Sequence, residues 1–344
     1  MSQPAVALSI AATLITVTCI LFWPKKGWAA LLFRGLRTDQ RERIEDALKH
    51  LYDCEYVGTA ATIQSLAGAL ELSNSRIAEL IERLEAMQLV RSQDVGLHLT
   101  AEGRRYALRI IRIHRLWETY LADQTGLEEG EWHGEADRLE HNTTAAQIEQ
   151  VIRETGNPRF DPHGDPIPSA DGEMPPRQGE PLIALSPDTL ASIVHVEDEP
   201  EAIYAQLRAQ RIRVGQRVTV LDKAADRIRV EVDGEEHVMA PIVAANVWVT
   251  RLPADTQAER FDRLSSLRVG QSRKVIGISP LCQGLQRRRL LDLGLVPGTE
   301  VTAVMDSPTR NPTGYRIRGA VIALRREQAD LVHIQPMGTA EGQS

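Results

Sequence analysis

The sequence predicts an α+β protein in which an apolar N-terminal helix precedes a helix-rich region and two small β-barrels. Three observations lead to this fold class. Residues 4–23 contain no charged side chain. Residues 37–141 place apolar side chains at helical spacing, whereas short runs rich in β-branched residues follow residue 181. With 344 residues, 42% of them hydrophobic and 25% charged, the chain cannot be collagen-like or wholly disordered.

Charge and cysteine content exclude several functional classes. The net charge is -7, so overall basicity does not indicate nucleic-acid binding. Cys19, Cys54 and Cys282 lie far apart without a CxxC pair, which excludes a disulfide framework and a zinc ribbon. No nucleophile stands beside a suitably placed base, so we expect that the protein is not an enzyme.

The uncharged run at residues 4–23 has the length of a membrane span, because a helix of that length rises about 30 Å. Lys25 and Lys26 follow it, so the positive-inside rule places the bulk of the chain in the cytoplasm. We predict that residues 1–36 form a single-pass transmembrane anchor in the inner (cytoplasmic) membrane. A cleaved signal peptide fits poorly because no basic residue precedes the run. A buried core helix is the remaining alternative.

Residues 37–108 predict a winged helix-turn-helix domain. Its parts are an amphipathic helix from Arg37, short helices over residues 62–70 and 75–87, and a hairpin that pairs residues 89–91 with 97–99. Ser73 is predicted to cap the second short helix. A bundle of plain helices would explain the same apolar spacing. The charge of residues 37–110, ten basic against twelve acidic side chains, does not favour DNA by itself.

Residues 109–180 carry the strongest chemical signal. One long helix, capped by Thr100, places His114 and Glu118 at i, i+4 on one face. The next predicted helix carries His133, Asp137, Glu140 and His141. Imidazole and carboxylate are the ligands that first-row divalent metals select, so this pattern predicts a metal site. A salt-bridged surface is the alternative, since Arg112, Arg115 and Arg138 lie among these residues.

Three segments match a known module in order and spacing: residues 114–118 (HRLWE), 133–141 (HGEADRLEH) and 161–168 (DPHGDPIP). They resemble the metal-binding and dimerisation domain of the diphtheria toxin repressor family, which comprises bacterial iron- and manganese-dependent transcriptional regulators. The resemblance covers about residues 38–250 and includes the winged helix. It implies a homodimer that binds palindromic double-stranded DNA operators.

The same resemblance implies the ligands. The primary metal site would contain Asp46, Asp137, Glu140 and His141. The ancillary site would contain His114, Glu118 and His133, with Glu199 and Glu201 as further candidates. This oxygen and imidazole set favours Mn(II) or Fe(II). Lys49 stands where the manganese branch has a Glu, which is a departure from the paired manganese arrangement.

The DNA-facing residues follow from the family's pattern and from local positive charge. The predicted contacts are Ser73, Ser75, Arg76, Glu79, Arg83 and Arg91. Because histidine binds metal as the neutral ring, we expect activation to weaken as the pH falls through the histidine range.

The C-terminal half predicts two related small domains. Residues 155–181 contain eleven Gly or Pro and mark a linker. Residues 181–253, with a helix over 201–209, resemble the family's SH3-like barrel. Residues 263–337 resemble the FeoA-like accessory domain of ferrous iron transporters. The two are a loose tandem repeat, in which residues 212–215 match residues 295–298.

We therefore predict a membrane-anchored, Mn- or Fe-dependent DNA-binding transcriptional regulator, a homodimeric repressor of metal-uptake genes. The alternative is a membrane adaptor or metal sensor for a ferrous iron transporter that lacks sequence-specific DNA binding. Residues 263–326 carry twelve basic and three acidic side chains. The partner of this basic second barrel stays open among DNA phosphate, the anionic membrane surface and a protein.

Overall fold

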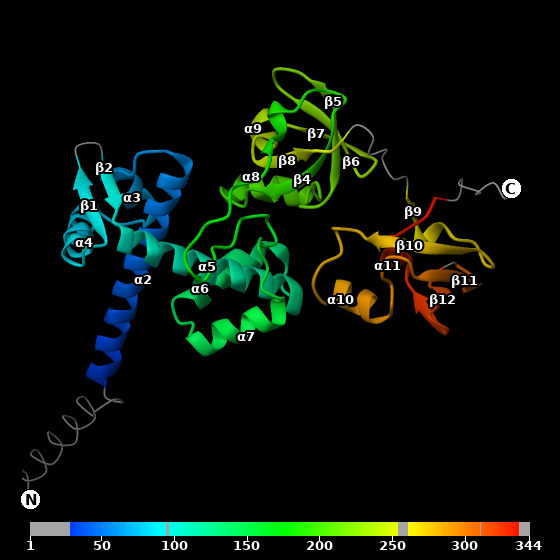
Figure 1. Cartoon of the computed structure of the whole chain (residues 1–344), viewed down its shortest axis with the longest axis horizontal. Coiled ribbons are helices and arrows are strands. Elements are labelled where there is room, and N and C mark those ends of the chain that lie inside the picture. The colour runs from blue at the N-terminus through cyan, green and yellow to red at the C-terminus, as the bar shows by residue number, and fades with distance from the viewer. Residues whose placement is uncertain (1–27, 94–95, 254–260, 310, 337–344) are drawn as a thin grey trace, which may run out of the picture. The chain divides into compact units, whose positions relative to one another are not determined.

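The computed structural model describes residues 28–93, 96–253, 261–309 and 311–336 (Figure 1). The chain divides into two compact units. The first contains the residues up to Arg112 together with residues 140–142 and 170–173, and the second contains the remainder. The predicted anchor at residues 4–23 lies outside the described residues. Within the described ranges, no helix combines the length and the apolar character needed to cross a bilayer.

A winged helix occupies the first unit. Its elements are α2 (Trp28–Val57), α3 (Ile63–Ala69), α4 (Asn74–Ala86), β1 (Val90–Gln93) and β2 (Gly96–Leu99). The predicted apolar stripe of α4 is buried, as its spacing requires. The expected cap of α4 is wrong in detail. Ser73 holds the N-cap position, but its hydroxyl lies 3.1 Å from that of Ser75 and makes no capping bond.

Three helices follow the wing: α5 (Ala101–Gln124), α6 (Trp132–Glu140) and α7 (Ala145–Thr155). Thr100 caps α5 as predicted, because its hydroxyl accepts a hydrogen bond from the Gly103 amide at 3.0 Å. Helix α7 was not predicted. It begins with a capping box between Thr144 and Gln147 and ends at Gly156, whose φ is +76°. The first half of the predicted linker is packed, since most of residues 161–168 are buried.

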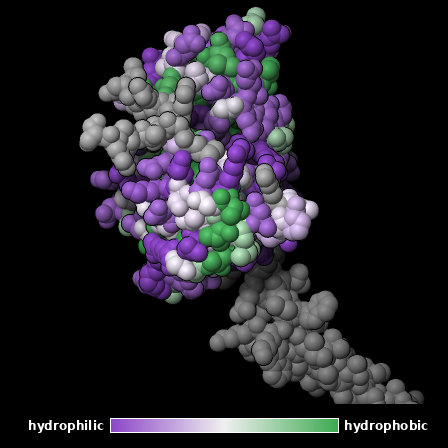
Figure 2. Space-filling model, turned by 90° about the vertical axis from the view of Figure 1, so that its right-hand side faces the viewer, coloured by the Kyte–Doolittle hydropathy of each residue, from purple (hydrophilic) through white to green (hydrophobic). Residues whose placement is uncertain are grey.

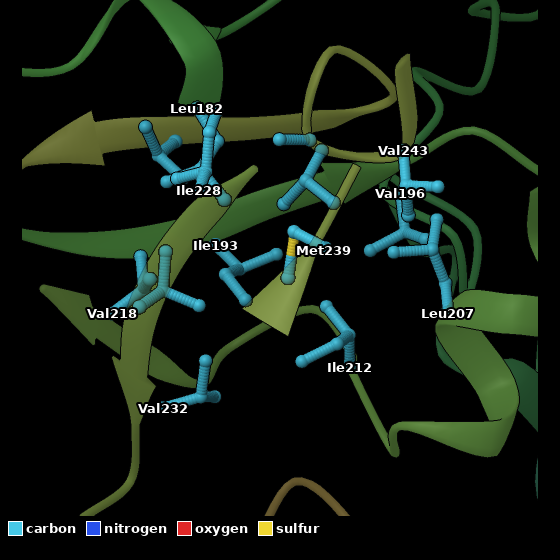
Figure 3. Packing of buried hydrophobic residues seen from close by; sticks show 14 of the residues in the cluster. Leu182, Ile193, Val196, Leu207, Ile212, Val218, Ile228, Val232, Met239 and Val243 are labelled. Carbon is cyan, nitrogen blue, oxygen red and sulfur yellow. The ribbon is translucent and has the colours of Figure 1, made fainter. Parts of the chain in front are cut away.

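The first sheet has the order β3-β8-β4-β5-β6-β7 and surrounds an aliphatic core (Figure 3). Its strands are β3 (Glu180–Pro181), β4 (Leu190–Val196), β5 (Arg217–Lys223), β6 (Ile228–Val232), β7 (Glu235–Met239) and β8 (Val247–Arg251). Two helices, α8 (Glu201–Ala209) and α9 (Pro241–Ala244), complete this domain. In Figure 3, Leu207 and Val243 from these helices join Ile193 and Met239 in one cluster.

The second sheet repeats this plan in the order β13-β12-β11-β10-β14-β9. Its elements are β9 (Asp262–Arg263), β10 (Ser272–Ile278), α10 (Gly284–Asp292), β11 (Glu300–Asp306), β12 (Thr313–Ile317), β13 (Ala320–Leu324), α11 (Arg326–Ala329) and β14 (Val332–Ile334). The mixed α+β class is confirmed. The predicted closed barrels are not seen, because the two end strands of each described sheet do not pair with one another.

Candidate metal centre

One group of ligand types gathers in the first unit. Asp46 comes from α2, Glu140 ends α6, and His141 follows directly. His141 Nε2 lies 3.3 Å from Asp46 Oδ1 and 3.5 Å from Glu140 Oε1. One ligand atom from each of the three lies within 4.8 Å of the others, so they can converge on one ion. We call this group the Asp46 cluster.

Glu45 fixes the histidine of the Asp46 cluster. Its fully buried carboxylate lies 2.7 Å from His141 Nδ1 and accepts hydrogen bonds from Tyr106 and Arg41, both at 2.7 Å. Burial by itself would raise the pKa of Glu45, but these hydrogen bonds outweigh it and hold the pKa below its usual value. When Nδ1–H donates to Glu45, Nε2 is left facing Asp46. Sequence reasoning missed Glu45, although its neighbour Asp46 was predicted.

A cation from the chain itself contacts the Asp46 cluster. Lys49 Nζ lies 3.0 and 3.2 Å from the two oxygens of Glu140, whose side chain is fully buried. The ammonium group therefore balances the buried carboxylate. Burial lowers the pKa of His141, but hydrogen bonds to Asp46 and Glu45 and the charge of Glu140 outweigh it and raise the pKa to about 10.

A second group, which we call the Glu118 cluster, gathers in the second unit around α5 and α6. Glu118 Oε1 lies 3.1 Å from His114 Nε2 and 3.2 Å from His133 Nδ1, and the two rings meet edge to face. Each of the three offers one ligand atom within 4.8 Å of the others. Although burial raises the pKa of Glu118, the two imidazoles dominate and hold it well below the usual value.

Further acids surround His133. Asp137 lies 3.2 Å from His114 Nδ1 and 3.6 Å from His133 Nε2, so this predicted primary ligand contacts two predicted ancillary ones. Asp198 Oδ2 lies 3.2 Å from His133 Nδ1 and Glu199 Oε1 lies 3.6 Å from Nε2. Burial lowers the pKa of His133, but hydrogen bonds to Asp198 and Glu118 raise it to about 10.

The two acids proposed from the first sheet domain have different surroundings. Glu199 reaches the Glu118 cluster, whereas Glu201 forms an ion pair with Arg208 at 3.8 Å. Asp198, which sequence reasoning missed, makes the closer contact with His133. Asp198 stands one residue before the predicted Glu199, in a run of acidic residues that precedes α8. The spacing of these residues alone does not indicate which carboxylate faces His133.

His163 supplies the test of whether a cation fits this region. Glu118, His163 and Asp198 also bring ligand atoms within 4.8 Å of one another. The hydroxyl of Tyr204 donates to Glu129 at 2.9 Å, so in the neutral ring His163 Nδ1 donates to Tyr204 at 3.2 Å and Nε2 carries the lone pair. This buried Nε2 atom has no hydrogen-bond partner among the described residues. A lone pair left unpaired beside two carboxylates suits a divalent cation.

The predicted DNA contacts lie on helix α4 and strand β1 of the first unit. Ser73, Ser75, Arg76, Glu79 and Arg83 belong to α4 or its N-cap, and Arg91 lies on β1; all six are exposed. The opposite side of α4 is buried, so these residues point away from the core.

Two segments match known protein families. Residues 100–169 match the family described as iron dependent repressor, metal binding and dimerisation domain. Residues 263–336 match the FeoA domain family. The first match includes every residue of the Glu118 cluster together with Glu140 and His141.

Curated relatives and solved structures agree with these matches. The iron-dependent repressor IdeR of Mycobacterium leprae is 30% identical over 217 residues, which cover 59% of this chain and 94% of the relative. The diphtheria toxin repressor of Corynebacterium efficiens is 29% identical over 199 residues, 54% of this chain and 85% of the relative. A manganese-dependent transcriptional repressor in complex with manganese superposes with a TM-score of 0.55 at 29% identity, covering 61% of this chain and all of the other.

Proposed function

We propose that this chain, which belongs to the iron-dependent repressor family, is a metal-dependent transcriptional repressor that binds DNA as a homodimer. Its membership of the family rests on 30% identity over nearly the full length of a repressor relative. The relatives described above are repressors, and the one of known structure is a manganese-dependent transcriptional repressor. Mn(II) and Fe(II) are the metals that this proposal assigns.

The observation that carries the proposal is the contact between Asp46 and His141. Asp46 belongs to the first helix of the winged domain, while His141 follows the last turn of α6, yet their side chains lie 3.3 Å apart. Asp46, Glu140 and His141 would hold the ion, which supplies positive charge between carboxylates when bound. Glu45 holds the His141 ring in place from its other nitrogen.

The chain's own residues then couple this centre to DNA. Helix α2 carries Asp46 and packs with α3, which leads to the exposed residues of α4. Fixing α2 therefore restricts where α4 can lie. In a two-fold dimer the two copies of α4 must enter major grooves about one DNA turn apart, roughly 34 Å. A metal that converts a mostly incompetent population into a competent one must favour the competent state by several kcal/mol.

We further propose that the repressor is anchored in the inner membrane through residues 4–23, with the bulk of the chain in the cytoplasm. The uncharged run and the lysines after it support this part of the proposal. Membrane anchoring would keep the regulator close to the site where metal ions enter the cell.

Operator binding tests the proposed function. Duplex DNA from the region upstream of the gene is titrated with the full chain, with and without Mn(II) or Fe(II), in a gel-shift assay. We expect a metal-dependent shift that the Glu140→Ala, His141→Ala variant loses. Glu149→Ala on the exposed face of α7 is the control and should bind as the wild type does.

Two outcomes count against this assignment. If DNA binding depended equally on metal in the wild type and the double variant, the Asp46 cluster would not be the site through which metal activates DNA binding. A metal-loaded chain that gives no sequence-specific shift with any operator fragment would favour the adaptor function, which the FeoA-family match of residues 263–336 makes the second candidate.

A further inference from the structure

The two sheets share one backbone plan but differ on their outer faces. In the first sheet, Thr219 pairs with Glu231, and Glu231 pairs with Glu236. At the corresponding positions of the second sheet, Thr302 pairs with Arg316, and Arg316 pairs with Val321. Both rows carry a bulge at the same point of the first strand pair. The second sheet therefore carries a basic and apolar row where the first sheet carries an acidic one, in the same register.

The hairpin turns show the same reversal. Asp233 and Gly234 form one turn, with φ of +49° and +87°, and Arg318 and Gly319 form the other, with φ of +48° and +88°. Asp tolerates the left-handed conformation well, whereas Arg gains nothing from it. The stem of Arg318 crosses Gly294, where an added Cβ would come within 2.8 Å of Arg318 Cδ. The backbone thus makes room for a cation at this turn.

Exposed apolar side chains accompany these cations. Met305 is 60% exposed and Val321 is 52% exposed. The Met305 side chain lies over Gly314, where a Cβ would come within 2.6 Å of its Cγ. The first sheet has Asp222 and Arg229 at this pair of positions, and they form an ion pair with each other at 3.9 Å. Figure 2 views the molecule from the right-hand side of Figure 1 and shows a mostly hydrophilic surface with hydrophobic groups between.

On the outer face of the second sheet, positive charge exceeds negative charge among the described residues. Arg316 and Arg318 line a hollow of about 420 Å³ with Thr299, Thr302 and Gly319, in which Glu300 is the single acidic residue. Neither Arg316 nor Arg318 forms an ion pair with another described residue. We call Met305, Arg316, Arg318 and Val321 the cationic face.

We propose that the cationic face docks on the anionic lipid surface of the membrane. Arginines that flank exposed Met and Val match a lipid surface, which offers phosphate groups above an apolar interior. DNA phosphate would attract the arginines equally but gives Met305 and Val321 nothing to pack on. The inference rests in part on the proposed anchoring, because residues 4–23 would hold the domain near the anionic leaflet.

Oxidation of Met305 by dilute peroxide tests this docking. The full chain is mixed with nanodiscs of phosphatidylcholine, with or without phosphatidylserine, and the rates of Met305 and Met87 are compared by peptide mass spectrometry. Met87 is also exposed and belongs to the first unit, so it serves as the internal reference. We expect phosphatidylserine to slow Met305 oxidation about fivefold or more, because each arginine near an anionic surface strengthens binding by about that factor and the bound face is shielded from peroxide.

The matched variant is Arg316→Glu, Arg318→Asp, which installs the residues that the first sheet carries at Glu231 and Asp233 on the same backbone. It should fold normally and lose the effect of phosphatidylserine. Arg159→Glu, Arg227→Asp changes the charge equally at two other exposed sites and should keep the effect.

The outcomes separate docking from anchoring. Protection of Met305 that is equal in both kinds of disc would overturn the inference and leave the anchor intact. Protection by phosphatidylserine in a chain that does not associate with neutral discs would support the inference and reject the anchor. Protection by duplex DNA but not by phosphatidylserine would assign the face to nucleic acid and overturn the inference.

Discussion

The Asp46 cluster and the Glu118 cluster bury their carboxylates with different counter-charges. In the first, Lys49 contacts Glu140 and Arg41 contacts Glu45, so permanent cations accompany both buried acids. In the second, the cations around Glu118 are histidines. A lysine or arginine keeps its charge across the physiological pH range, whereas imidazole loses its charge when the proton leaves. We therefore expect the metal-free first cluster, which has Lys49 and Arg41 beside its buried acids as well as His141, to depend less on a proton or a metal ion than the second.

Removing the lysine gives the sharpest test of this contrast. Lys49→Met leaves the buried Glu140 carboxylate without its ammonium partner, so the metal-free chain should lose about 3 kcal/mol of unfolding free energy. Mn(II) should then stabilise the variant more than the wild type, because the ion replaces the missing charge. Thermal and denaturant unfolding with and without Mn(II) measure both effects.

Lys49→Arg keeps the charge and serves as the control, with near wild-type stability in the metal-free state. If Mn(II) stabilised Lys49→Met no more than the wild type, the Lys49 ammonium would not be the group that balances the Glu140 carboxylate in the metal-free chain.

Glu45→Gln sharpens the comparison by changing only the support of His141. The amide loses the charge that orients the ring, so the affinity of the Asp46 cluster for Mn(II) should fall about 10- to 100-fold. Calorimetric titration measures it, with Glu42→Gln on the same helix as the control. An unchanged affinity would show that the contact of 2.7 Å between Glu45 and His141 has no role in metal binding.

Proton release should reveal both clusters at once. The pKa values of His141 and His133 are about 10, so both rings are charged at neutral pH and must lose a proton to bind metal. Affinity should therefore rise about tenfold per pH unit for each ring, up to about pH 10. Calorimetry in two buffers of different ionisation enthalpy counts the protons, and we expect about one per cluster at pH 7.5.

The same pKa values set the pH dependence of the metal-free fold. A histidine with a raised pKa contributes stability that is fully present below its unfolded value, near 6.5, and is lost as the pH rises through about 10. Metal-free stability that rises between pH 7 and 10 would contradict this. The window lies above the ordinary histidine range that the sequence predicts, because spacing does not reveal the acids that surround each ring.

His163→Asn should have the smallest effect on the metal-free chain. The ring nitrogen Nε2 has no partner among the described residues, and the amide can still donate toward Tyr204, so the expected loss is about 1 kcal/mol or less. Metal affinity of the Glu118 cluster should nevertheless fall if the ion uses Nε2. An unchanged affinity would restrict that ion to His114, Glu118 and His133.

Strongly periodic elements could be predicted from the sequence, and side-chain partners could not. The buried stripe of α4 follows from apolar residues at helical spacing, and Thr100 is a strong cap signal. Strand β7 was missed because Glu235 and Glu236 lie exposed on a strand at the end of the sheet, where packing demands little of the sequence. Glu45 and Asp198 were missed because each stands beside another acid, and only the fold selects which one turns inward.

The brief return of residues 140–142 to the first unit limits how the protein can be dissected. A fragment that stops after Arg112 would keep the winged helix and Asp46. It would lose Glu140 and His141, the other two predicted metal ligands of the Asp46 cluster. Transferring the winged helix alone to another regulator therefore cannot transfer metal-dependent control. The graft must also carry the chain as far as Asn142.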